Sequence, residues 1–319
     1  MSEVVIVASA FGPDAIRRDG HQGWLRTAAQ AGAAGFEVRR ELFASEAQAS
    51  LPALRALGEA IDGLGMWSVY STPATLYTAT GALDEPALRL AVEEADALGA
   101  RFVKLQLGGF GIDDAGKATI GDEPRSHLKR ATREPEAAEA KADPAKSGGA
   151  AGNVWDPSHE RSTAHGARIA AWMSGSRARL VVENGQRVEG GMIRQFAGLF
   201  EALRGEGYAD VLGMTFDIGN WQWPGEAPVE AARQLAQHVE YIHCKAVTGI
   251  GARRFAVAPA ADDPVCVAVL PLLPRNVPRG IEFPFDSNRV ATDASHYVGW
   301  LRRAAPLAPS TVEHHQETQ

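Results

Sequence analysis

The chain has 319 residues, of which 45% are hydrophobic and 22% charged, and its formal net charge is −7. This composition is ordinary for a globular protein, while the negative charge disfavours nucleic-acid binding, which needs a basic surface. Two cysteines are too few to predict a disulfide framework. The N-terminal apolar run is too short for a signal peptide, and no apolar stretch reaches the roughly 20 residues of a membrane span. We therefore expect a cytoplasmic protein that binds neither nucleic acid nor membrane, and the sequence is compatible with a homo-oligomer.

The first part of the chain alternates short apolar runs with amphipathic stretches. Apolar runs of this length predict buried strands, and we expect four of them, at 4–9, 36–42, 66–72 and 102–107. The amphipathic stretches between them predict helices, at 21–34, 52–64 and 87–98. The segment 11–20 is expected to be a loop.

The alternation stops between residues 112 and 157. This segment is rich in Ala, Lys, Glu, Asp, Pro and Gly and has almost no periodic apolar residues. Such a composition cannot form a packed core. We therefore predict one barrel domain over 1–305, with a solvated insertion at 112–157 after the fourth strand and a disordered tail at 306–319. The functional alternative for the insertion is a lid.

Regular alternation returns after the insertion. Four more buried strands are expected, at 179–184, 212–217, 239–245 and 279–284, and five helices, at 158–173, 192–203, 227–238, 263–273 and 292–304. Eight buried strands alternating with helices predict an α/β fold of the (β/α)₈ barrel type. A doubly wound sheet is the alternative.

Each of the last four expected strands carries a metal-binding residue type at or near its carboxyl end. These residues are Glu183, Asp217, His243 and Glu282. The active sites of (β/α)₈ barrels lie at this end of the strands, so we expect the four side chains to converge. Three carboxylates and one imidazole are a hard ligand set. They predict one divalent ion, Mn²⁺ first, with Mg²⁺ or Co²⁺ as alternatives.

The motifs that carry these residues resemble those of a known barrel family. VVEN, TFDIGN, YIHCK and GIEF, together with AGAAGFEVRREL near the second strand, look like the xylose isomerase-like sugar isomerases and epimerases. The resemblance implies that the four residues bind a divalent metal, and that Glu183 and Glu282 exchange a proton with the substrate. Two departures are visible: Asn220 and Trp221 stand where epimerases often have a His, and no Asp follows Lys245 closely.

The expected chemistry also needs such a carboxylate pair. Removing a proton next to a carbonyl builds negative charge, and a metal can stabilise the resulting enediolate as a Lewis acid. A carboxylate on each face of the carbon can then remove and return the proton. We therefore expect a metal-dependent isomerase or epimerase of a small keto sugar or polyol.

Three alternative functions could use residues of the same kind. A dehydratase or lyase would begin with the same proton abstraction, and a non-catalytic barrel would only bind sugar. A DNA-repair endonuclease is disfavoured, because neither a histidine cluster nor a basic groove is visible.

Further polar and aromatic residues are expected to bind the substrate. They are Arg39, Glu41, Lys104, Lys245, Asn220 and Trp221. Arg39 and Glu41 share one face of the second strand with Glu37, and three charges on a strand covered on both sides need a polar destination. The mouth of the barrel would supply it, although a strand end that emerges into solvent is the alternative. No phosphate-binding glycine motif occurs, so we expect an unphosphorylated substrate.

Overall fold

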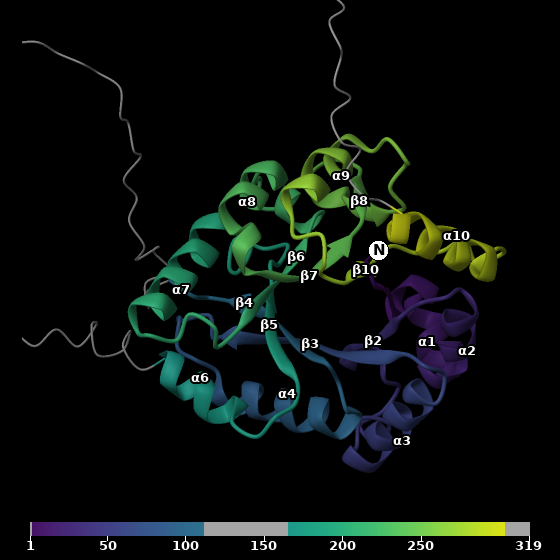
Figure 1. The fold of residues 1–319 in the computed structure, drawn as a ribbon, viewed down its shortest axis with the longest axis horizontal. Coiled ribbons are helices and arrows are strands. Elements are labelled where there is room, and N and C mark those ends of the chain that lie inside the picture. The colour runs from purple at the N-terminus through teal and green to yellow at the C-terminus, as the bar shows by residue number, and fades with distance from the viewer. Residues whose placement is uncertain (1, 112–164, 304–319) are drawn as a thin grey trace, which may run out of the picture.

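The computed structural model describes residues 2–111 and 165–303, and it is a closed barrel of eight parallel strands surrounded by helices (Figure 1). Around the barrel the strands follow the order β1, β10, β7, β6, β5, β4, β3, β2. Their bounds are β1 Val4–Val7, β2 Gly35–Arg39, β3 Trp67–Tyr77, β4 Phe102–Gly108, β5 Arg179–Glu183, β6 Gly213–Asp217, β7 Val239–Cys244 and β10 Arg279–Ile281. The predicted (β/α)₈ barrel is confirmed, and the doubly wound alternative is excluded.

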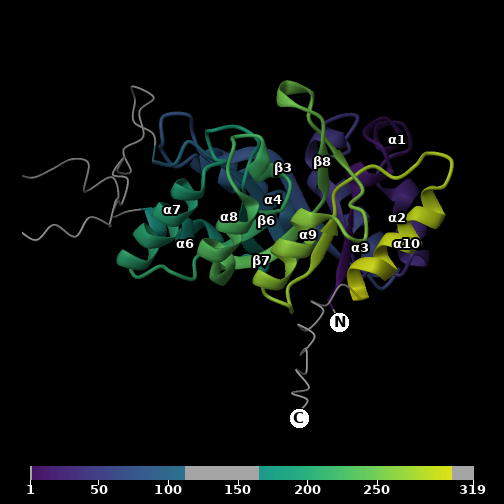
Figure 2. The same cartoon turned by 90° about the horizontal axis from the view of Figure 1, so that it is seen from above.

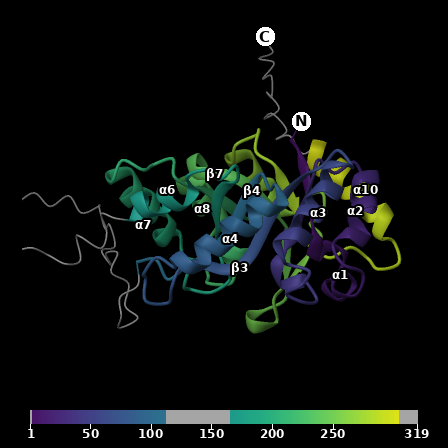
Figure 3. The same ribbon diagram turned by 90° about the horizontal axis from the view of Figure 1, so that it is seen from below.

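Helices form a layer around these strands, as Figures 1 and 3 show. They are α1 Pro13–Asp19, α2 Gln22–Gln30, α3 Leu51–Asp62, α4 Glu85–Leu98, α6 His165–Met173, α7 Ile193–Gly205, α8 Pro228–Leu235, α9 Pro264–Val269 and α10 Val290–Arg303. The prediction of a loop at 11–20 was wrong, because α1 occupies most of it. This helix has only seven residues between two glycines and buries only Ile16, so it offers little apolar periodicity.

The loop after β7 contains a second small element. β8 (Ala246–Thr248) and β9 (Phe255–Val257) form an antiparallel hairpin, which stands out beyond the helices in Figure 2. The expected insertion at 112–157 and the expected tail at 306–319 lie outside the described residues. Within the described ranges, no helix combines the length and apolar character that crossing a bilayer requires.

Alternating side chains divide the apolar core into two parts. The larger part fills the layer between strands and helices, and includes Val4 and Ile6 of β1. A smaller cluster lies apart from it, and consists of Val5, Val69, Phe102, Val181 and Tyr241. Because side chains of a strand alternate between its faces, this smaller cluster fills the barrel interior.

The position two residues further along three of these strands carries a titratable side chain. Phe102, Val181 and Tyr241 are followed at that spacing by Lys104, Glu183 and His243. These residues point to the same face as the apolar cluster, so a polar layer lies directly above it, toward the carboxyl ends of the strands.

Candidate functional site

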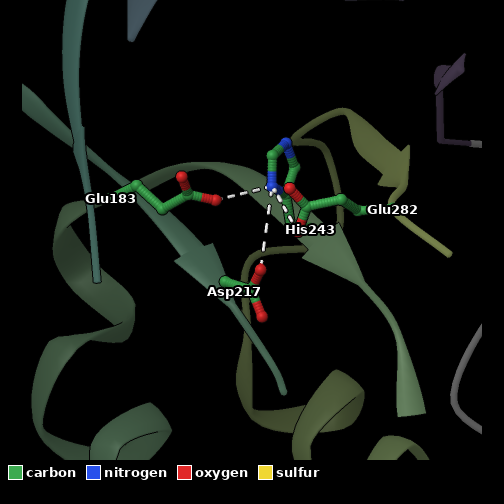
Figure 4. A group of neighbouring side chains, drawn as sticks. All are labelled: Glu183, Asp217, His243 and Glu282. Carbon is green, nitrogen blue, oxygen red and sulfur yellow. Dashed lines mark ion pairs between the residues drawn. The ribbon is translucent and has the colours of Figure 1, made fainter. Parts of the chain in front are cut away.

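The four residues expected to bind a metal come together above the barrel interior (Figure 4). Glu183 and Asp217 are the last residues of β5 and β6, His243 lies in β7, and Glu282 directly follows β10. One potential ligand atom of each lies within 4.8 Å of the others. The Nδ1 atom of His243 is 2.6 Å from Glu183 Oε1, 3.2 Å from Glu282 Oε2 and 3.8 Å from Asp217 Oδ2.

Glu183 is held by one of its two carboxylate oxygens. Lys104 Nζ and the Gln106 side-chain amide both donate to Oε2, each at 2.5 Å. Oε1 has no hydrogen-bond partner among the described residues and faces His243. Burial alone would raise the pKa of Glu183, but Lys104 and His243 hold it well below its usual range. The carboxylate is therefore ionised and fixed in orientation.

Asp217 shows the same division between its oxygens. Oδ1 accepts the backbone N–H groups of Gly219 and Asn220, both at 2.8 Å, so it caps the turn after β6. The Asn184 side chain fixes the backbone at the same place, accepting from Asp217 N–H at 2.8 Å and donating to its carbonyl at 3.0 Å. Oδ2 remains for the cluster, 2.7 Å from Lys245 Nζ.

Glu282 is held by two cations. Arg39 Nη1 donates to Oε1 at 2.7 Å, and Lys245 Nζ donates to Oε2 at 2.6 Å. Arg39 also donates from Nε to Glu41 at 2.7 Å. The Glu282 side chain is 12% exposed, whereas that of Glu183 is 2% exposed. The two glutamates thus differ in access from the barrel mouth.

The donor atoms left over by these contacts fit a divalent cation. Glu183 Oε1, Asp217 Oδ2 and His243 Nδ1 are buried and make ion-pair contacts with Lys245 or with one another, but no hydrogen bond of regular geometry among the described residues, which native structures rarely leave unexplained. Together with Glu282 they offer a hard O₃N set, as Mn²⁺ or Mg²⁺ prefers.

The charges around the cluster support the same fit. Five carboxylates share three cationic side chains here, namely Glu37, Glu41, Glu183, Asp217 and Glu282 with Arg39, Lys104 and Lys245. Burial, with the charge of Glu282, raises the pKa of Asp217 to about 8 even though Lys245 opposes the shift. A divalent cation would balance the excess negative charge, which protons on Asp217 and on His243, whose pKa the neighbouring carboxylates raise despite its burial, otherwise reduce.

The other nitrogen of His243 contacts a residue that the sequence placed only on a polar face. Glu37 Oε2 is 2.8 Å from His243 Nε2 and also accepts the Tyr241 hydroxyl at 2.9 Å. Burial alone would raise the pKa of Glu37, but Lys104 and His243 lower it to about 2. The sequence did show that the FEVR strand contains a charged residue, Glu37. It could not identify the partner of Glu37, because His243 lies 206 residues away.

The structure separates the residues expected to bind substrate into three pairs. Arg39 and Glu41 lie at the mouth, with side chains 18% and 30% exposed. Lys245 and Lys104 are buried among carboxylates.

Asn220 and Trp221 are buried behind the site. Asn220 donates to the Asn184 carbonyl at 2.8 Å. Trp221 is fully buried against Phe196 of α7 and Phe216 of β6, with ring centroids 5.7 and 5.5 Å apart. The structure therefore does not bring Trp221 to the barrel mouth.

No protein-family model and no curated protein matches the sequence. Solved structures do match it. With a xylose isomerase domain containing protein from Salmonella typhimurium the TM-score is 0.60 at 11% identity, covering 95% of this chain and 98% of that one. With D-psicose 3-epimerase from Clostridium cellulolyticum H10 it is 0.58 at 10% identity, covering 94% and 98%. With a probable 3-DHS dehydratase from Bacillus anthracis it is 0.51 at 12% identity, covering 95% and 100%. The chain therefore has the fold of the xylose isomerase-like barrels, which its motifs resemble.

Proposed function

We propose that this protein is a divalent-metal-dependent isomerase or epimerase of a small, unphosphorylated keto sugar or polyol. The observation that carries the proposal is the convergence of Glu183, Asp217, His243 and Glu282, whose potential ligand atoms lie within 4.8 Å of one another at the carboxyl ends of barrel strands. The likeness in fold to a D-psicose 3-epimerase supports this choice of reaction.

The four residues would hold the metal through Glu183 Oε1, Asp217 Oδ2, His243 Nδ1 and a carboxylate oxygen of Glu282. A divalent ion supplies Lewis-acid stabilisation of the negative charge that develops on a carbonyl oxygen when the neighbouring carbon loses its proton. Mn²⁺ is our first choice for such a set, with Mg²⁺ or Co²⁺ as alternatives.

Glu183 and Glu282 are the proposed acid–base pair. β6 and β7 separate β5 from β10 in the barrel, so the two glutamates approach the centre from opposite ends of a four-strand arc. Their neighbouring cations hold both carboxylates ionised, because the pKa of each is lowered despite its burial. One can accept the proton from the reacting carbon, while the other first takes a proton from solvent, which reaches the partly exposed Glu282, and then delivers it to the opposite face.

The substrate contacts are proposed at the open side of the cluster. Arg39 and Glu41 are partly exposed there and would contact substrate hydroxyls, with Lys245 below them. Arg39, Lys104 and Lys245 each contact at least two carboxylates. Because these cations are already paired, the described site favours an uncharged substrate over a phosphorylated or carboxylated one.

A dehydratase is the second candidate. The unequal exposure of Glu282 and Glu183 favours it, since in dehydration one group removes the proton and another assists the leaving hydroxyl. The likeness in fold to a probable 3-DHS dehydratase is compatible with it.

The test is solvent exchange. The Mn²⁺-loaded protein would be incubated in D₂O with a panel of keto sugars and polyols, and deuterium at the carbon next to the carbonyl would be scored by NMR after metal removal. Glu183→Gln and Glu282→Gln should each lower turnover by at least about 100-fold, the usual contribution of a general acid–base group. Glu46→Gln, a change at an exposed surface ion pair, is the matched control.

Three outcomes separate the candidates. Deuterium in recovered sugars together with a new epimer or isomer supports the proposal. An enone absorbance with loss of water indicates the dehydratase. Deuterium exchange at the wild-type rate in both glutamine variants would rule out the two-carboxylate mechanism.

A further inference from the structure

We propose that Glu37 is a positioning residue of the metal centre, which fixes the ring of His243 so that Nδ1 faces the metal and Nε2 carries the proton. This inference rests on the metal centre of the proposed function and concerns a residue outside the four proposed ligands. Glu37 lies on β2, and the strand of His243 is separated from β2 by β1 and β10.

The two ring nitrogens of His243 face different surroundings. Nδ1 faces the carboxylates of Glu183, Asp217 and Glu282, as Figure 4 shows. Nε2 lies 2.8 Å from Glu37 Oε2. An ionised carboxylate only accepts hydrogen bonds, whereas a neutral imidazole has one N–H and one bare nitrogen. In the neutral form that binds a metal, Nε2 therefore donates to Glu37, and Nδ1 keeps the lone pair that a metal ligand needs.

Glu37 is built into the barrel interior rather than placed to contact substrate. It is fully buried, and it lies on the side of the imidazole away from the ligand cluster. Tyr241, two residues before His243 on β7, donates its hydroxyl to the same Oε2 atom at 2.9 Å. Two neighbouring side chains of one strand thus hold one carboxylate oxygen.

The second oxygen of Glu37 reaches another proposed ligand. Oε1 is 3.4 Å from Lys104 Nζ, which in turn lies 2.5 Å from Glu183 Oε2. Lys104 compensates the charge of two buried carboxylates. Burying these carboxylates without a cation would be energetically costly. Glu37 therefore sets the orientation of His243 directly and that of Glu183 through Lys104.

A glycine makes room for this arrangement. A Cβ atom at Gly280 on β10 would collide with the Tyr241 hydroxyl oxygen and would lie 2.8 Å from His243 Cδ2. Contacts this short require a neighbour to move. Any side chain at this position would thus displace the two groups that meet at Glu37.

The test compares Glu37→Gln with Tyr241→Phe in the full chain, using Co²⁺ as the probe. Each protein is titrated with Co²⁺ against a competing chelator, and its thermal stability is measured without metal. Loss of an outer partner of a metal-binding histidine typically weakens metal affinity about 10–100-fold, and we expect a loss in this range for Glu37→Gln. Tyr241→Phe removes a hydrogen bond to the same oxygen but leaves the carboxylate, so its loss should stay below about fivefold.

A second measurement needs no variant. In ¹⁵N-histidine-labelled wild type loaded with Mg²⁺, long-range ¹H–¹⁵N correlations report which nitrogen of His243 is protonated. We expect the proton on Nε2. A proton on Nδ1, or Co²⁺ affinity in Glu37→Gln equal to that of wild type, overturns the proposed role of Glu37 but not the proposed metal centre. Wild type that binds no Co²⁺ overturns the metal centre as well.

Discussion

Protonation of His21 should make the protein less stable in mild acid, through a single buried imidazole. His21 is buried, and its Nε2 accepts the backbone N–H of Arg39 at 3.2 Å. Burial lowers the pKa of His21 from 6.5 to about 4. In the unfolded chain the imidazole regains its ordinary pKa.

The sign follows from these two values. Between pH 6.5 and about pH 4 the unfolded state binds the proton and the folded state does not, so the free energy of unfolding falls as the pH falls. The full loss over this window corresponds to about 3 kcal/mol. At pH 5.0, protonation of the unfolded state lowers the free energy of unfolding by about 2 kcal/mol relative to pH 7.5.

The assay is urea unfolding of wild type and His21→Gln at pH 7.5 and pH 5.0. Glutamine can accept the same N–H but does not titrate. It loses the packing of the imidazole against Phe43, whose ring centroid is 4.5 Å away, but this loss is nearly equal at both pH values. We expect wild type to lose about 2 kcal/mol more than the variant between the two conditions. An equal loss in both proteins would refute the argument, because the remaining titrating groups are common to both.

Three further changes test the site and its support. Gly280→Ala should displace Tyr241 and His243 and cost about 1–3 kcal/mol, read as a lower melting temperature and lower metal content by elemental analysis; unchanged metal content would contradict the tight fit. Asp217→Asn keeps an oxygen for the turn after β6, so far-UV circular dichroism should match wild type while Co²⁺ affinity drops, and full affinity would remove this residue from the ligand set. Arg179→Met removes a two-point ion pair with a carboxylate of β7. It should lower the melting temperature by the equivalent of about 1–3 kcal/mol without changing Co²⁺ affinity, and a weaker affinity would show that the effect is not confined to stability.

The hydrophobic pattern of the sequence determined where the strands lie along the chain. Short runs that are apolar on both faces indicate buried strands in an α/β fold, and parallel strands in a barrel bring their carboxyl ends to one face. The polar residues at the ends of β5, β6 and β7 therefore had to meet, and the structure brings Glu183, Asp217 and His243 together. This part of the site follows from local burial and chain direction alone.

The local pattern failed where a segment was short or changed direction. The seven-residue helix α1 has too few turns to show a period. Trp221 follows Asp217 in a 3-10 turn, which directs it toward α7 instead of the mouth. In such turns, side-chain direction depends on backbone angles that the sequence pattern does not fix.

Only the tertiary structure determined which buried residues contact the four proposed metal ligands. Glu37 and His243 are 206 residues apart, and nothing in either strand identifies the other. Lys104 could have reached solvent at the mouth, but closure of the barrel buries it between two carboxylates. A strand's sequence states which face is polar, because alternation is local. Which charges then pair across the interior depends on the closure and stagger of all eight strands.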